Sequence, residues 1–204
     1  MAAEFVVYGS RGSGSAPIEA ALTLLGEPYS LVERGPREDH PGGSAMGQVP
    51  VVRLPNGELM TESAAILIHI ADTHAGSKLS PAIDDPRRPA FLRWMTFVSA
   101  QIYALVWARD NPMRLATDAA AARLILERTA ERRLFCWRYM DTELTPGRYL
   151  LGGDLTVLDL YVAVTSTWGP GRAAFTAAAP RLAEVMRRVY DDPRLRALWA
   201  ERLS

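Results

Sequence analysis

One stretch of sequence decides the fold: Gly47-Gln48-Val49-Pro50-Val51-Val52-Arg53-Leu54-Pro55-Asn56-Gly57-Glu58-Leu59-Met60-Thr61-Glu62-Ser63-Ala64-Ala65-Ile66. Its β-branched and aliphatic residues 49–54 predict a strand, Pro55-Asn56-Gly57 predicts a hairpin turn, and residues 59–60 predict a short returning strand. Thr61-Glu62-Ser63 then opens a helix. Pro50 has no backbone N–H to donate to a neighbouring strand, so one end of the first strand should be left unpaired.

The residues before this stretch predict a strand, a helix and a second strand. Residues 4–8 are mostly apolar, and they lead into Gly9-Ser10-Arg11-Gly12-Ser13-Gly14-Ser15, a loop of small residues whose backbone can approach a ligand closely. A helix is expected over residues 16–25, with a proline in its first turn and Gly26 at its end. Residues 29–33 form the second strand, which should lie parallel to the first with a right-handed crossover.

The residues after the stretch 47–66 predict helices. A helix from Glu62 to about His74 is followed by a proline-rich segment, which we interpret as a linker over residues 79–87. The predicted fold is α+β with two domains, residues 1–78 and residues 88–204, of which the second is all helical. Its helices are expected over residues 89–107, 116–144, 180–190 and 193–203.

Composition excludes several classes of function. Lys+Arg and Asp+Glu both total 23, so no net charge favours nucleic acid or an anionic membrane surface as a partner. The single Cys136 excludes an intramolecular disulfide, and no apolar run approaches the length of a membrane span. We therefore expect a cytoplasmic protein. His40, His69 and His74 lack metal-ligand spacing, so no metal is expected.

Two further patterns could be read as sites. The glycines of residues 9–15 imitate a dinucleotide fingerprint, but they do not fit G-x-G-x-x-G and no further βαβ units occur. Thr156 and Asp159 have the spacing of a capping box, with Leu155 and Leu160 as its hydrophobic staple. A capping box fixes where a helix begins and by itself indicates no chemistry.

The order of these elements resembles the cytosolic glutathione S-transferase family, in a bacterial form with a serine-type loop. The resemblance runs from Phe5 to about Trp199, and its most specific part is the pairing of Gln48-Val49-Pro50 with Glu62-Ser63. It implies a thioredoxin-like βαβ-ββα domain that holds glutathione as co-substrate. It also implies that the helical domain supplies the pocket for an electrophile and that the protein is a homodimer.

The same resemblance implies the glutathione-binding residues. Pro50 would be a cis proline that turns the backbone of Val49 toward the ligand, so that the cysteinyl part of glutathione pairs like an added strand. Glu62 would face the ammonium of the γ-glutamyl end, and Ser63 would take its carboxylate at a helix N-terminus. Gln48 would contact the glycyl part, together with His40.

The thiol-activating residue should lie in the loop after the first strand. Ser13 matches the catalytic position of the serine-type and cysteine-type classes, where a hydroxyl that donates to sulfur favours the thiolate. Ser10 and Ser15 are close enough in sequence to compete for this role. The chain departs from the family pattern because it has no arginine in the helix over residues 16–25.

The electrophile pocket should draw on the helix over residues 89–107 and on the residues just after it, so Gln101, Tyr103, Trp107 and Arg109 are candidates. Aromatic residues at helical spacing are also typical of a core. The predicted function is transfer of glutathione to a small apolar electrophile. The alternatives are a glutathione-dependent isomerase, dehalogenase or peroxidase, and a non-catalytic binding or assembly module with the same fold.

Overall fold

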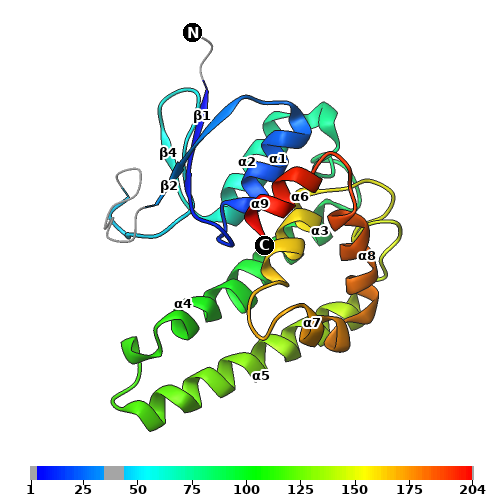
Figure 1. The fold of residues 1–204 in the computed structure, drawn as a ribbon. Helices are drawn as coiled ribbons and strands as arrows, with labels where there is room; N and C mark the ends of the chain where they lie inside the picture. The colour runs from blue at the N-terminus through cyan, green and yellow to red at the C-terminus, as the bar shows by residue number, and fades with distance from the viewer. Residues whose placement is uncertain (1–3, 35–43, 204) are drawn as a thin grey trace.

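The computed structural model describes residues 4–34 and 44–203, and its N-terminal part is built on a four-stranded sheet (Figure 1). The strands are β1 (Phe5–Gly9), β2 (Tyr29–Glu33), β3 (Val51–Arg53) and β4 (Leu59–Met60), in the order β2-β1-β3-β4. β1 and β2 are parallel, which confirms the predicted βαβ unit, whereas β3 lies antiparallel to both β1 and β4.

Two helices, α1 (Ala16–Leu25) and α2 (Ser63–Thr73), pack side by side on one face of this sheet. α1 has the predicted bounds, and it ends at Gly26, whose φ of 70° is the left-handed conformation that glycine tolerates. α2 begins at Ser63 because Glu62, with φ 66° and ψ 98°, is not helical. This is the thioredoxin-like domain that the resemblance implied.

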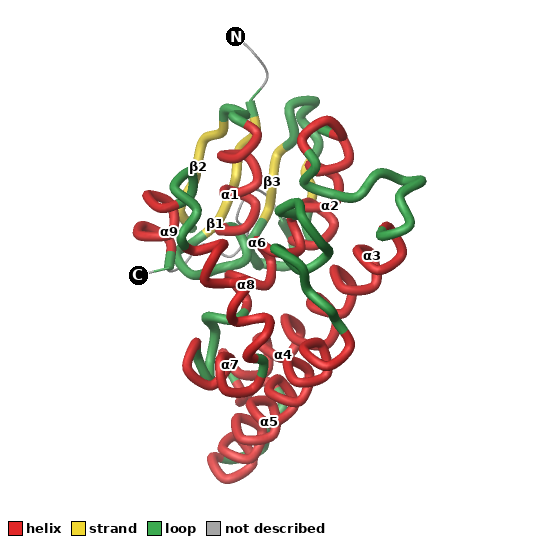
Figure 2. The backbone as a smooth tube through the Cα atoms, turned by 90° about the vertical axis from the view of Figure 1, so that its right-hand side faces the viewer, coloured by secondary structure: helices red, strands yellow, loops and turns green. Residues whose placement is uncertain are grey.

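The rest of the chain is helical, and it comes after turns and irregular structure over residues 78–87. Its helices are α3 (Arg88–Phe97), α4 (Ala104–Asp110), α5 (Ala119–Glu143), α6 (Val157–Thr165), α7 (Arg172–Ala178), α8 (Pro180–Tyr190) and α9 (Arg196–Arg202). Short 3-10 turns occupy Ala75–Ser77 and Pro112–Arg114. α4 and α5 run together away from the sheet (Figure 2).

The helix predicted over residues 89–107 differs from the observed one. A π-helical segment, Val98–Tyr103, separates α3 from α4. A π segment widens the turn and rotates the residues after it around the helix axis. Before and at the start of this segment, Met95 and Val98 are buried, whereas Leu92 is 40% exposed. The sequence pattern also missed α7 altogether.

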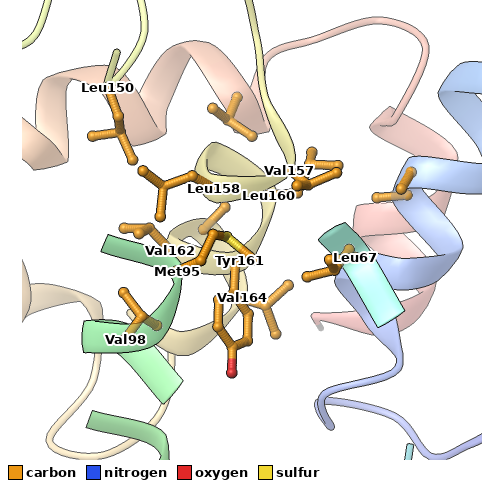
Figure 3. Packing of buried hydrophobic residues seen from close by; sticks show 14 of the residues in the cluster. Leu67, Met95, Val98, Leu150, Val157, Leu158, Leu160, Tyr161, Val162 and Val164 are labelled. Carbon is orange, nitrogen blue, oxygen red and sulfur yellow. The ribbon is translucent and has the colours of Figure 1, made fainter. Parts of the chain in front are cut away.

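α6 forms the centre of the core. All nine of its residues are buried, and its apolar side chains pack against α3 and α2 (Figure 3). The predicted capping box is present: Asp159 accepts hydrogen bonds from the Thr156 N–H and hydroxyl, both at 2.8 Å, and from the Leu150 N–H at 2.8 Å. Burial raises the pKa of Asp159 to about 6, although three donors face its carboxylate.

The last helix returns to the first domain. α9 lies against α1 (Figure 1), and there Arg202, which is 1% exposed, donates to Glu19 of α1 at 2.8 Å. It also donates to Glu33 at the end of β2. The two domains are therefore joined by a buried ion pair between Arg202 and Glu19 as well as by a shared apolar core. No helix in the described part of the chain is both long and apolar enough to cross a membrane.

Candidate active site

A cavity of about 660 Å³ opens between the sheet and the helical domain. The loop after β1, the segment before β3 and the start of α2 line one side of it. The π segment, α4 and the residues around α6 line the other. Its polar and aromatic lining includes Ser10, Ser13, Gln48, Glu62, Ser63, Ser99, Tyr103, Trp107, Tyr161 and Trp168. A pocket of this size and composition is the expected form of a small-molecule site.

The backbone at Val49 is free to bind a ligand. The Val49–Pro50 peptide bond is cis, as the resemblance implied, and Pro50 is buried while Val49 is only partly so. β3 begins one residue later, at Val51. Within residues 4–34 and 44–203, neither the N–H nor the C=O of Val49 has a hydrogen-bond partner. Unpaired groups at the end of a strand can accept an extended peptide as an added strand.

Glu62 and Ser63 lie at the opposite end of this segment. Glu62 lines the cavity, and its positive φ of 66° is a conformation that non-glycine residues rarely adopt and that costs about 1–3 kcal/mol. Ser63 starts α2, whose first N–H groups have no side-chain cap, so an anion is favoured there. The Ser63 hydroxyl donates to the hydroxyl of Tyr161 at 3.0 Å.

The loop after β1 holds Ser13 in a position to donate. The Ser13 Oγ accepts from the Ser10 N–H at 3.2 Å and from the Ser15 N–H at 3.3 Å. Because these two donors occupy the two lone pairs of the hydroxyl, its hydrogen must point toward another acceptor. The Ser15 Oγ, 3.1 Å away, is one such acceptor, and a ligand atom in the cavity is the other.

The three loop serines differ in their access to the cavity. Ser15 is fully buried and does not line it, and its side chain instead packs on Gly9, where an added Cβ would meet the Ser15 Oγ. Ser10 lines the cavity, but its hydrogen bonds come from its backbone: its N–H donates to Ser13 and its carbonyl accepts from the Ser13 N–H. The geometry therefore favours Ser13.

The four candidates for the electrophile side divide into two groups. Tyr103, Trp107 and Arg109 line the cavity. Gln101 is not among the lining residues, and its Oε1 accepts from the Arg132 Nη2 of α5 at 2.7 Å. The π segment explains the difference, because it directs Ser99 and Tyr103 to the cavity instead. His40 lies outside the described residues.

Sequence reasoning missed two residues of the site. Tyr161 reaches the cavity from α6, and burial raises its pKa to about 12, so it stays protonated. The sequence gives only a weak indication of this role, namely that Tyr161 follows the capping box closely. Trp168 lines the cavity and donates from its Nε1 to the Gly12 carbonyl at 2.6 Å. Nothing in the local sequence of Trp168 indicates a contact with a loop near the N-terminus.

The charges of the cavity suit an anion. Among its described lining residues are the arginines Arg11, Arg34, Arg109 and Arg114 and the acids Glu62 and Asp110. The arginines leave an excess of two positive charges, although Arg109 pairs with its neighbour Asp110. No group of His, Cys, Asp or Glu that could hold a metal ion occurs in the described part of the chain.

Known proteins match this chain over nearly its full length. It is 32% identical over 197 residues to the uncharacterized GST-like protein YncG of Escherichia coli strain K12, covering 93% of this chain and 94% of that protein. It is 22% identical over 206 residues to the glutathione S-transferase GstA of Escherichia coli O157:H7, covering 94% and 96%. No protein-family model matches the chain.

A solved structure agrees with these matches. The fold superposes with a TM-score of 0.85 on a Sulfitobacter glutathione transferase homolog with bound glutathione, at 22% identity and covering 98% of both chains. Fold and site together define a protein of the glutathione-transferase type. The relationship to YncG settles the family: the chain belongs to the glutathione S-transferase family.

Proposed function

We propose that this protein binds glutathione in the cavity and uses its thiolate to attack a small electrophile. The observation that carries the proposal is the backbone of Val49, which has no hydrogen-bond partner among the described residues and lies beside a cis proline in the same cavity as the Ser13 hydroxyl. A peptide-like ligand that pairs with Val49 has its cysteinyl residue next to Pro50. The thiol is then on the side of the loop after β1.

The two ends of glutathione match the two ends of the segment. The Glu62 carboxylate faces the γ-glutamyl ammonium, and Ser63 at the start of α2 takes the γ-glutamyl carboxylate. Gln48 contacts the glycyl part, as His40 does in the implied site. Glutathione in its thiolate form carries two net negative charges, and arginines are among the described residues that line the cavity.

Ser13 activates the thiol in this mechanism. Its hydroxyl is polarised by two backbone N–H donors, and its hydrogen is therefore a good donor to the thiolate. Stabilising the thiolate lowers the pKa of the bound thiol and raises the fraction of the reactive anion at neutral pH. With a chlorinated aromatic acceptor, the C–S bond forms at the ring carbon and the C–Cl bond breaks. Chloride leaves with the bonding electrons.

The acceptor lies on the side of the helical domain. Tyr103 and Trp107 supply aromatic surface there, and Arg109 supplies charge, so a small, mainly apolar electrophile fits this side. We further propose a cytoplasmic homodimer. Exposed apolar side chains on α3 and α5, namely Leu92, Leu124 and Phe135, support an interface on the helical domain.

Binding and turnover test the proposal separately. Calorimetry should detect glutathione binding, and absorbance should track conjugation of chlorodinitrobenzene. We expect Ser13→Ala to lower turnover about a hundredfold, at the lower end of the range for loss of one transition-state donor, and to leave affinity nearly unchanged. Ser77→Ala, remote from the cavity, is the matched control. Absence of glutathione binding by the wild type would refute the site, and full activity of Ser13→Ala would refute the role of Ser13.

A further inference from the structure

Tyr103 reaches across the cavity to the loop that carries Ser13. It is the last residue of the π segment, Val98–Tyr103. A Cβ added to Gly14 would lie 2.5 Å from the Tyr103 hydroxyl oxygen and 3.1 Å from the Cδ of Pro50. The hydroxyl therefore sits against Gly14 and close to the cis proline. This is the place where a ligand that pairs with Val49 would present its cysteinyl side chain.

The hydrogen of this hydroxyl is uncommitted. The Tyr103 oxygen lies against the backbone of Gly14. Within residues 4–34 and 44–203, the hydroxyl makes no hydrogen bond to an acceptor. A tyrosine hydroxyl that lines a cavity in this way has its proton left for a ligand. Burial and the nearby Tyr161, Glu62 and Asp110 raise the pKa of Tyr103, so it stays protonated while a thiol ionises.

The ring of Tyr103 is held in this orientation by other aromatic side chains. The Trp168 ring meets it edge to face at 4.8 Å between centroids, and the Tyr161 ring lies at 6.2 Å. Contacts of this kind fix a ring without consuming its hydroxyl. The side chain is therefore preorganised, and a donor that needs no reorganisation is the most effective type in a catalytic site.

We propose that the Tyr103 hydroxyl is a second donor to the glutathione thiolate, acting from the helical domain while Ser13 acts from the loop. This inference rests on the proposed function, and it moves Tyr103 from the electrophile wall to the reacting sulfur. A thiolate accepts several hydrogen bonds, so the two donors act together. Packing of Tyr103 on Gly14 alone would require a ring there but no hydroxyl.

Tyr103→Phe tests the proposal because it removes the hydroxyl and keeps the ring contacts. The readout is the pKa of the bound glutathione thiol, measured from the ultraviolet absorbance of the thiolate as pH is varied. No electrophilic substrate is present in this measurement. We expect the pKa to rise by about one unit, which corresponds to a roughly tenfold smaller thiolate fraction at pH values below it. Tyr190→Phe is the matched control, since its hydroxyl donates to the Ala163 carbonyl at 2.6 Å away from the cavity.

Gly14→Ala is a second variant that leaves Tyr103 intact. Its Cβ would displace the Tyr103 hydroxyl, so the thiol pKa should rise in the same direction. If Ser13→Ala raises the thiol pKa and Tyr103→Phe leaves it unchanged, the role of Tyr103 is overturned while the proposed function stands. If Tyr103→Phe weakens glutathione binding without moving the pKa, Tyr103 only packs. If wild type fails to bind glutathione, the proposed function itself falls.

Discussion

Replacing Trp168 with phenylalanine should separate positioning of the catalytic loop from the stability of the fold. Gly12, with φ 66°, is held on both sides: its carbonyl accepts from the Trp168 Nε1 at 2.6 Å, and its N–H donates to the Arg202 carbonyl at 2.9 Å. Trp168→Phe removes the first bond and leaves an aromatic ring beside Tyr103. The neighbouring Ser13 should therefore lose its fixed position.

The size of both effects of Trp168→Phe depends on the loss of one neutral hydrogen bond. Its loss should lower the free energy of unfolding by about 0.5–1.5 kcal/mol, since Gly12 is only half-buried and water can replace the donor. If about half of that energy orients Ser13, the thiol pKa of bound glutathione should rise by about 0.2 to 0.5 unit. Urea denaturation measures the first quantity, and thiolate absorbance measures the second.

The control for Trp168→Phe is Trp199→Phe. The Trp199 Nε1 donates to the Val189 carbonyl at 3.1 Å, so this variant loses the same kind of bond away from the loop. It should reduce stability and leave the thiol pKa unchanged. If Trp168→Phe behaves in the same way, the bond to Gly12 stabilises the fold and has no part in setting the acidity of the thiol.

Two further predictions concern binding and stability. Glu62→Gln should weaken glutathione binding by about 1.5–3 kcal/mol, because a charged hydrogen bond is lost. Glu58→Gln, in the nearby hairpin, is the control and should not weaken binding. If calorimetry gives the same dissociation constant for Glu62→Gln and the wild type, the role of Glu62 is contradicted. Asp159→Asn should lower the unfolding free energy by about 2–4 kcal/mol in urea denaturation, because its amide N–H₂ would face donors from Leu150 or Thr156. The pKa of Asp159 in the folded state is raised to about 6, so protonation of its carboxyl group stabilises the wild type below about pH 4. This contribution is lost as the pH rises through 6. The difference in unfolding free energy between the wild type and Asp159→Asn should therefore become smaller between about pH 4 and pH 6.

The elements that could be predicted from sequence depend on local chemistry. The hairpin between β3 and β4 is indicated by its Pro-Asn-Gly turn, α1 by a proline at its start and Gly26 at its end, and α6 by Thr156 and Asp159. Each of these signals acts within a few residues. The cis bond at Pro50 is not set by local chemistry, and only resemblance to a family pointed to it.

The helical side of the site could not be predicted in the same way. The assignment of Gln101 to the electrophile pocket assumes a continuous α-helix over residues 89–107. The π segment shifts the helical register, and no local sequence pattern marks this segment. In the structure the Gln101 side chain contacts Arg132 of α5, a tertiary contact that helical spacing alone does not indicate.

Ranking the three serines takes more than sequence spacing. The family resemblance favours Ser13, and the structure separates it from Ser10 and Ser15 by burial and by the donors that surround each side chain. Arg202 brings a guanidinium to Glu19 of α1 from 183 residues away, and its carbonyl holds Gly12 of the serine loop. The loop that should activate the thiol is thus held by the last helix of the chain, so its geometry depends on the helical domain being folded against the first.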